Sequence, residues 1–312
     1  MVWANSHHQR NEESRRGARD RIALVALAGL LVSGCTTSFT RTTGTQAGLC
    51  GLQVADAALG AYEDLRAVAG DNAYYQGYLR IVVSPQPDAV DFTQVSDAAL
   101  SVQIEQRIRT YRQVRAAYAL LQQLCSGGTA RDASQAYAAL FETLRGLSAD
   151  DAASAETRKM VSELPADLSS LLQARQIARA QSALGQTAKD LSALWDKELP
   201  TWNDYIDSVY VRHYAAGLLS LRLSNFDERE LNKVAEGPYG APIKAGLFKL
   251  QKYREAVQKA DSLKAELLLV SNALQQLAVL HRQLSDTVTP FADVLSTQRQ
   301  IGHYVGRADK KP

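Results

Sequence analysis

The hydrophobic positions in the last quarter of the chain recur at alternating spacings of three and four residues. An average spacing of about 3.5 residues is typical of helices that pack as left-handed supercoils. It predicts one helix from about residue 243 to residue 288, roughly 70 Å long at about 1.5 Å per residue. Such a helix is stable only if its apolar face packs against other helices. The positions on this face are Tyr253, Ala256, Ala260, Leu263, Leu267, Val270, Leu274, Leu277, His281, Leu284, Val288 and Phe291.

Two earlier segments carry the same pattern and can supply the partner helices. The first ends at the glycine pair 127–128, a typical helix stop. Its apolar positions are Leu100, Ile104, Ile108, Tyr111, Val114, Tyr118, Leu121 and Cys125. The second contains Pro200, where we expect a kink or a new first helical turn. Its positions are Ala188, Leu191, Trp195, Leu199, Trp202, Ile206, Val209, His213, Ala216 and Leu223.

Shorter helical patterns cover residues 49–68, 132–147 and 165–183, and residues 236–243 have the glycines and prolines of a turn between antiparallel helices. Strand-like alternation is limited to residues 78–83, a short stretch that comes just before a proline. We therefore predict an all-α fold, an elongated antiparallel helical bundle with coiled-coil-like packing.

Residues 71–91 form the longest segment without a helical pattern. Loops of this length are uncommon in compact domains and often carry function. Tyr74, Tyr75 and Tyr78 lie in it, and tyrosine rings can stack on sugars or on a protein surface. These three residues are the candidates for ligand or partner binding, although core packing is the simpler role for the aromatic residues elsewhere on the predicted helices.

The apolar run at residues 22–34 contains no charge for about 13 residues, fewer than the roughly 20 that a helix needs to cross a bilayer. Arg15, Arg16, Arg19 and Arg21 precede it, and small residues follow. A basic segment, a short apolar segment and small residues, in this order, are typical of a secretory signal peptide.

The end of this run, Val32-Ser33-Gly34-Cys35, resembles the lipobox of bacterial lipoproteins. The resemblance implies that Cys35 is acylated, for example with palmitate, and becomes the mature N-terminus. It also implies outer-membrane sorting in a Gram-negative organism, because Thr36 stands where retention in the inner membrane typically requires Asp. The expected location is therefore the outer membrane, lipid-anchored and facing the periplasm.

The resulting organisation has four parts. Residues 1–34 are the predicted lipoprotein signal peptide, and residues 35–45, rich in threonine, are a lipidated tether. Residues 46–303 are the predicted helical bundle, and residues 304–312 are a polar tail. Several acyl chains would anchor such a protein firmly, since one chain alone binds a membrane only marginally.

Charge and composition restrict the function further. Five of the 35 basic and three of the 33 acidic residues lie in residues 1–34, so residues 35–312 carry equal numbers of each and no net formal charge. Nothing in this balance suggests the basic surface of a nucleic-acid-binding protein. We therefore predict no nucleic-acid partner.

The two remaining cysteines, Cys50 and Cys125, would lie in a compartment where disulfides persist. If the first two predicted helices pack antiparallel, the start of one and the end of the next come together. A Cys50–Cys125 disulfide is the first interpretation, and two separate buried thiols are the alternative.

The chain lacks the best-marked catalytic and cofactor motifs. It contains no HExxH, CxxC, GxSxG, SxxK, P-loop or GxGxxG motif, and His213, His281 and His303 all lack the Glu three residues earlier that a di-iron bundle site needs. We predict no catalytic residue, no metal and no cofactor, and we interpret His213 and His281 as polar residues that set the register of the core.

The sequence thus favours a non-enzymatic helical scaffold or adaptor in the cell envelope, held at the membrane through lipid on Cys35 and bound to an envelope protein. The alternative is a protein that binds a cell-wall or lipid fragment through the 71–91 loop. A hydrolase assembled from distant residues is a weaker third hypothesis.

Overall fold

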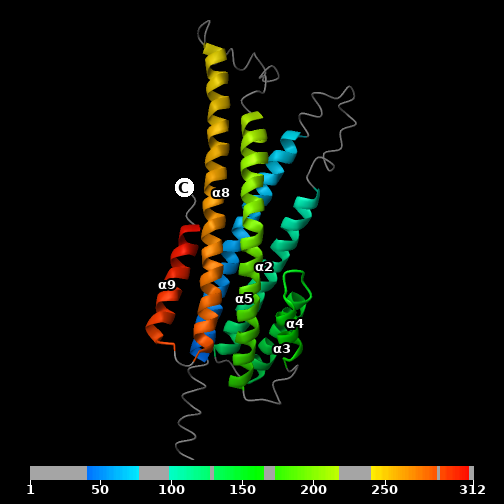
Figure 1. Cartoon of the computed structure of the whole chain (residues 1–312), viewed down its shortest axis with the longest axis vertical. Helices are drawn as coiled ribbons and strands as arrows, with labels where there is room; N and C mark the ends of the chain where they lie inside the picture. The colour runs from blue at the N-terminus through cyan, green and yellow to red at the C-terminus, as the bar shows by residue number, and fades with distance from the viewer. Residues whose placement is uncertain are drawn as a thin grey trace, which may run out of the picture.

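The structure, a computed structural model, describes residues 41–76, 98–126, 130–164, 173–217, 240–286 and 289–308, and these ranges contain helices and no strand (Figure 1). The all-α prediction is confirmed. The elements are, in chain order, the N-terminal helix (residues 41–76), α2 (Ala98–Cys125), α3 (Ala130–Ser148), α4 (Ala155–Ser162), α5 (Gln173–Asp204), the π-helix η4 (Tyr205–Ala215), α8 (Gly240–Ser285) and α9 (Phe291–Ala308).

Four long helices form the core: the N-terminal helix, α2, α5 and α8. The N-terminal helix runs antiparallel to α2, with Gly51 against the ring of Tyr118, and antiparallel to α8. It runs parallel to α5, where the ring centroids of Tyr62 and Trp195 lie 5.0 Å apart. Nε1 of Trp195 donates a hydrogen bond to the backbone oxygen of Leu267 on α8, at 3.1 Å. The shorter α3 and α4 pack beside α2 and α5, and α9 packs on α8.

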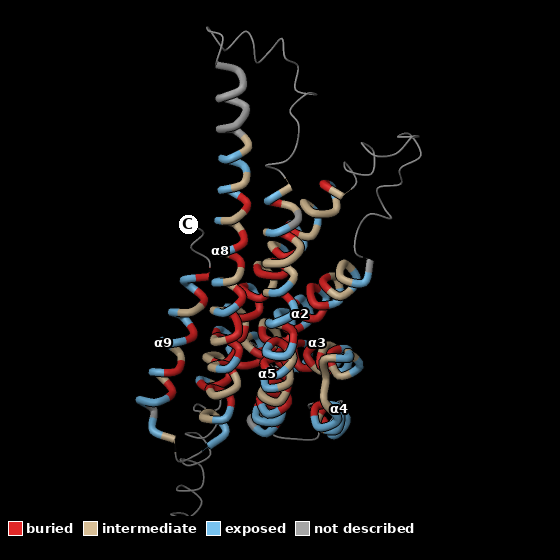
Figure 2. Tube along the Cα trace, turned by 45° about the horizontal axis from the view of Figure 1, so that its top comes forward, coloured by how far each residue is buried: buried red, intermediate tan, exposed pale blue. Residues whose placement is uncertain are grey.

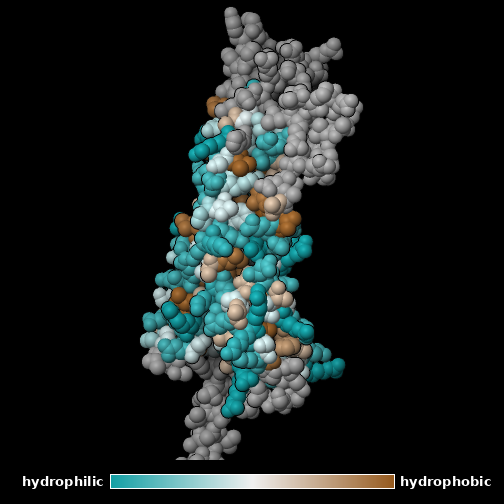
Figure 3. All heavy atoms as spheres, turned by 45° about the vertical axis from the view of Figure 1, so that its right-hand side comes forward, coloured by the Kyte–Doolittle hydropathy of each residue, from teal (hydrophilic) through white to brown (hydrophobic). Residues whose placement is uncertain are grey.

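Buried residues follow the predicted apolar faces, and Figure 2 shows them turned toward the axis of the bundle. On α8 all described positions from Ala256 to His281 in the predicted pattern are buried, and on α2 the same holds from Ile104 to Cys125. Val288 lies outside the described residues. The visible face in Figure 3 is mainly hydrophilic, with hydrophobic residues in small separate spots. The 3.5-residue spacing therefore identified the core correctly.

The apolar face predicted for residues 188–223, on α5 and η4, agrees with the structure only up to Ile206. Beyond it Tyr210 and Ala215 are buried, whereas Ala216 is exposed and Val209 is half-buried. The reason is η4, because the wider turn of a π-helix rotates the following side chains relative to an α-helix. The helix α5 runs on through Pro200 to Asp204, so the expected change of geometry occurs one turn later than predicted.

Three predicted boundaries are wrong. Residues 41–45, assigned to the tether, are helical, with Thr43 buried and Gly44 packed against Cys125. Residues 304–308, assigned to the polar tail, belong to α9, where Val305 and Ala308 are buried. Residues 71–76, assigned to the long loop, continue the N-terminal helix. In each case small or apolar side chains meet a neighbouring helix, and this contact outweighs the local polarity.

The separate helix α9 was not predicted, because the apolar pattern in the sequence continues from α8 to Phe291. The chain instead reverses between Ser285 and Phe291, and Pro290 directly precedes α9. The buried residues Val294, Thr297, Ile301, Val305 and Ala308 then repeat at helical spacing. Pro290 followed by a new helical repeat is the signal that would have separated the two helices.

One stretch of the described residues, Lys249–Ser285 in α8, is long and apolar enough to cross a membrane by length and composition alone. Its most apolar window is 44% buried within the bundle. The core helix of a bundle satisfies the same criteria, so this stretch is weak evidence for a membrane span.

Close packing of the N-terminal helix on α2 gives a first prediction. A side chain at Gly51 would overlap the ring of Tyr118, which is only 1% exposed and cannot move aside. We expect Gly51→Val to lower the free energy of unfolding by about 1–3 kcal/mol, the usual cost of overpacking. Chemical denaturation followed by circular dichroism measures it.

Gly70 is the matched control, because it lies on the same helix with no atom within 4 Å of an added Cβ. There Gly70→Val should leave stability unchanged or slightly higher, since valine has the better helix propensity. Equal effects at the two positions would contradict the close helix approach.

Candidate functional site

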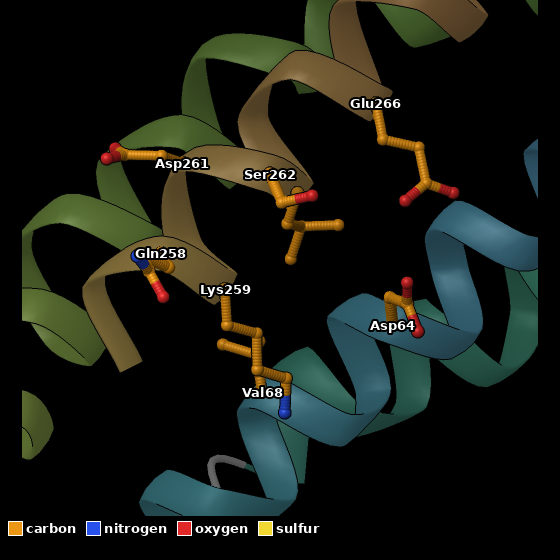
Figure 4. A pocket seen from close by; sticks show the side chains of 8 residues that line it. Asp64, Val68, Gln258, Lys259, Asp261, Ser262 and Glu266 are labelled. Atoms are coloured by element: carbon orange, nitrogen blue, oxygen red, sulfur yellow. The ribbon is translucent and has the colours of Figure 1, made fainter. Parts of the chain in front are cut away.

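A groove of about 680 Å³ lies between the N-terminal helix and α8 (Figure 4). Val68 and Leu263, both almost fully buried, form its floor. Its other lining residues are polar or charged: Asp64, Gln258, Lys259, Asp261, Ser262 and Glu266. The groove exists because the two helices meet through small and medium side chains at its floor while longer polar side chains line its sides.

An ion pair closes one end of this groove. Nζ of Lys259 donates to Oδ2 of Asp71 at 2.7 Å and lies 5.9 Å from the ring centroid of Tyr210. The hydroxyl of Tyr210 also donates to Asp71, at 3.4 Å. Burial, and then the charge of Asp71, raise the pKa of Tyr210, so this phenol stays neutral. The Lys259 ammonium is thus paired with the carboxylate of Asp71, which lies outside the groove.

The structure separates the three candidate tyrosines. Tyr74 is 75% exposed, whereas Tyr75 is buried against Gly217 and lies edge-on to Tyr214, with ring centroids 5.7 Å apart. Tyr78 lies outside the described residues. Assigning Tyr75 to ligand binding is therefore wrong, because helical periodicity in residues 71–76 turns this side chain into the core. Tyr74 stays a prediction.

A buried carboxylate lies at the centre of the bundle. Glu198 on α5 accepts hydrogen bonds from Nη2 of Arg107 at 2.8 Å, Nε of Arg107 at 3.0 Å, the hydroxyl of Tyr62 at 3.0 Å and Nε2 of Gln103 at 3.0 Å. Arg107 also lies 3.9 Å from Asp150, which follows α3. This polar network joins the N-terminal helix, α2, α5 and the α3–α4 connection.

Aromatic rings pack directly beside this network. Tyr62 contacts Tyr111, Trp195 and Trp202, with ring centroids 5.7, 5.0 and 6.2 Å apart. Burial is the main cause that raises the pKa of Tyr62 and of Tyr111 above the ordinary value. Both phenols therefore stay protonated, and Tyr62 is a hydrogen-bond donor to Glu198. The cluster can hold helices together but offers no ionised nucleophile.

His281 is a second polar core residue. Its Nε2 lies 2.9 Å from the hydroxyl of Tyr118, its side chain contacts the close-approach position Gly185, and it is 3% exposed. Burial lowers its pKa to about 4, although a backbone hydrogen bond with Gln181 acts in the opposite direction. The ring is neutral near pH 7, as a register-setting residue requires. The side chain of His213 is outside what the structure describes.

Cys50 and Cys125 are both buried free thiols, so the predicted disulfide is wrong and the alternative of two separate thiols holds. The sulfur of Cys125 lies against Gly44, whereas the next residue after Cys50, Gly51, meets Tyr118. Gly44, the residue against this sulfur, lies six residues, about 9 Å of helix, before Cys50. The N-terminal helix begins at least two turns earlier than predicted, so Cys50 lies in its third turn rather than near its start.

Burial also raises the pKa of Cys50 to about 11 and that of Cys125 to about 12. Only thiolates are effective nucleophiles and metal ligands, so neither thiol is suited to this chemistry at neutral pH. Among the described residues no group of three or more His, Cys, Asp or Glu could hold a metal ion. The two buried thiols are therefore suited to packing in the core.

Neither the groove nor the hydrogen-bond network around Glu198 was predicted from the sequence. The network had a readable signal, because Glu198 lies three residues after Trp195 and four before Trp202, which places a carboxyl group on a buried face. The groove had none, since it depends on which turn of the N-terminal helix meets which turn of α8. No protein-family model, no curated protein and no solved structure matches the chain.

Removing the partner of the buried carboxylate should be costly. We expect Arg107→Met to lower the free energy of unfolding by about 3–5 kcal/mol, because it leaves the Glu198 charge buried without its cation. The double variant Arg107→Met with Glu198→Leu should lose less, since no uncompensated charge remains. Urea denaturation of both proteins tests this, and a double variant less stable than the single one would contradict it.

The buried histidine predicts a dependence of stability on pH. The pKa of His281 is lower in the folded protein, about 4, than its ordinary value of 6.5, so the unfolded chain binds the proton more tightly. The neutral His281 side chain therefore contributes its full share of stability above about pH 6.5, and this share is lost as the pH falls toward 4. Between about pH 7 and pH 5 the loss should be about 2 kcal/mol.

The variant His281→Gln should remove this part of the pH dependence of stability. The control is His303→Gln, at an exposed position, which should leave the pH dependence unchanged. Denaturation curves of the three proteins at both pH values decide the matter. A wild-type slope retained by His281→Gln would show that other groups cause it.

Proposed function

We propose that this protein is a lipid-anchored, non-enzymatic helical scaffold of the outer membrane, held through acylated Cys35 and facing the periplasm. The proposal combines the lipobox-like segment before Cys35 with the shape of the described bundle. The proposed partner is an envelope protein, because a scaffold functions by binding other proteins.

The observation that carries the proposal is the place where the N-terminal helix begins. Residue 41 is already helical and lies only six residues after Cys35, a separation of at most about 20 Å even for an extended chain. The same end of the bundle contains the C-terminal end of α8 (Figure 1). An anchor at Cys35 would therefore hold one end of the bundle close to the lipid surface.

The length of α8 supports a spacing role. With 46 residues it measures about 70 Å, and it runs from the proposed anchor end past the other described helices (Figure 1). A bundle attached by one end can present its sides to partners at a set distance from the membrane. The charged residues at the centre of the bundle, Arg107 and Glu198, are paired with each other, as expected of residues that stabilise helix packing.

Fatty-acid labelling tests the anchor. Cells expressing the full chain and supplied with a labelled palmitate analogue should give a labelled protein in the outer-membrane fraction. The variant Cys35→Ser should lose both the label and the membrane association. Cys50→Ala is the matched control and should keep both, because Cys50 is buried in the bundle.

An unlabelled wild-type protein, or one that begins at Met1 in mass spectrometry, would refute the anchor. The scaffold role has its own test, photo-crosslinking in intact cells from exposed positions along the bundle. Crosslinks only to lipid, with no envelope protein at any position, would refute that role even if Cys35 is acylated.

A further inference from the structure

The buried imidazole of His281 on α8 is hydrogen-bonded to two other helices. Its Nε2 lies 2.9 Å from the hydroxyl of Tyr118 on α2. The ring also bonds to the backbone of Gln181 on α5, and this bond favours the charged ring, so a ring N–H donates to the Gln181 carbonyl oxygen. The other ring nitrogen, Nδ1, faces α5, where it lies 3.5 Å from the Cβ position of Gly185. The imidazole therefore joins α2, α5 and α8.

These two bonds decide where the hydrogen of the neutral ring lies. A carbonyl oxygen can only accept, so Nδ1 carries the hydrogen that is donated to Gln181. Nε2 of His281 is then the bare nitrogen and accepts from the hydroxyl of Tyr118. The neutral ring satisfies both bonds, with each donor facing an acceptor.

A second proton on the ring breaks this arrangement. Both nitrogens of an imidazolium are donors, so Nε2 of His281 and the hydroxyl of Tyr118 would point hydrogens at one another. Turning the hydroxyl would leave its own hydrogen without an acceptor, because the described residues give this hydroxyl one hydrogen-bond partner, His281. Tyr118 is only 1% exposed, so water does not replace that partner. Protonation thus leaves a donor unsatisfied in the core, which is costly.

The titratable groups packed around this site are neutral. Tyr118 lies on α2, with Cys50 of the N-terminal helix near it and Cys125 two turns further along α2. Burial raises the pKa of Tyr118, and it raises the pKa of Cys50 to about 11 and that of Cys125 to about 12. None of the three supplies a negative charge between pH 5 and pH 7.

The other helices around His281 also lack a buried counter-ion for it. Helix α5 presents Gln181 and Gly185, and α9 buries Val294 and Thr297 against α8. The charged residues on the neighbouring turns are exposed: Asp56, Arg115, Arg179, Lys189, Arg282, Asp286, Asp293 and Arg299. An imidazolium at this position would therefore be a buried positive charge without a partner, which strongly disfavours the closed packing.

The site lies near the end of the bundle where the N-terminal helix begins (Figure 1). Gly44 packs on Cys125 there, and Gly51 packs on the ring of Tyr118. Along α5, Glu198 comes 17 residues after Gln181, about 25 Å of helix. The Arg107–Glu198 pair thus holds the middle of the bundle at a distance from His281.

We propose that His281 is an acid-sensitive latch, whose protonation between about pH 7 and pH 5 opens this end of the bundle while the helices around Glu198 stay packed. The segments that open, named the His281 end, are residues 44–51, 118–125, 181–185 and 277–285. The latch itself does not depend on the proposed function. That the His281 end is the end nearest the membrane does rest on the proposed anchor at Cys35.

Hydrogen exchange of the purified full chain in detergent, read by mass spectrometry at pH 7 and pH 5, tests the latch. Exchange is corrected for the chemical rate at each pH. An opened ring regains its ordinary pKa of 6.5, against about 4 when closed, so the opening constant of the His281 end should rise about twentyfold. Residues 62–66, 103–107 and 195–202, around Glu198, should change less than about threefold, since local opening leaves them packed.

The buried thiols give a second readout of the same opening. Cys50 and Cys125 both lie in the His281 end. We expect 4,4′-dithiodipyridine to modify them about twentyfold faster at pH 5 than at pH 7, relative to glutathione under the same conditions. Peptide mapping distinguishes these two sites from Cys35.

Two matched variants assign the effect to the imidazole. His281→Gln keeps a polar amide that does not titrate and should remove the acid-induced increase, whereas His303→Gln, at an exposed position on α9, should retain it. An increase that persists in His281→Gln, or that disappears in His303→Gln, would overturn the latch. If His281→Gln does not fold at pH 7, the wild-type exchange profile still decides. Equal loss of protection in the His281 end and around Glu198, or no loss at pH 5, would overturn the proposal.

These outcomes are independent of the proposed function. A chain without palmitate label that still opens at the His281 end would remove the anchor and leave the latch. An acylated chain that crosslinks to envelope proteins, with the same exchange at both pH values, would leave the scaffold and remove the latch.

Discussion

A carboxylate buried among three helices must have its oxygen atoms satisfied, and this requirement sets the register of the bundle. Glu198 is 7% exposed and receives hydrogen bonds from Arg107, Gln103 and Tyr62. These donors come from two other helices, so sliding either helix by one turn, about 5.4 Å, would break its bonds. An apolar contact tolerates small shifts because it has no direction, whereas a buried charge without partners is strongly destabilising. The network therefore selects one alignment among several that the apolar pattern would allow.

Other features of the molecule depend on this alignment. The antiparallel pairing of the N-terminal helix with α2 places Gly44 beside Cys125 and Gly51 beside Tyr118. In this pairing Gly44, and not Cys50, lies against the sulfur of Cys125. The same alignment brings Tyr118 to His281 on α8, where a 2.9 Å contact between two buried polar groups adds a second directional constraint nearer the end of the bundle. The glycines allow this approach because their backbones can touch neighbouring side chains without a Cβ in the way.

The groove is the point at which this packing is incomplete. The N-terminal helix and α8 share a buried floor at Val68 and Leu263, but above it their side chains diverge and are polar. An ion pair links the lining residue Lys259 to Asp71, which lies outside the groove.

The sequence by itself determined the fold class, the long C-terminal helix, the apolar faces of α2 and α8, and the segment that resembles a lipoprotein signal. All of these depend on local periodicity or on a short ordered motif, which are properties of neighbouring residues. The tertiary structure alone decided the relative register of the helices. On it depend the separation of Cys50 from Cys125, the burial of Tyr75, the partners of Glu198 and the existence of the groove. Register is decided by contacts between residues far apart in the chain, such as the 136 positions between Tyr62 and Glu198, and the pattern along one helix carries no information on which turn of another helix it will meet.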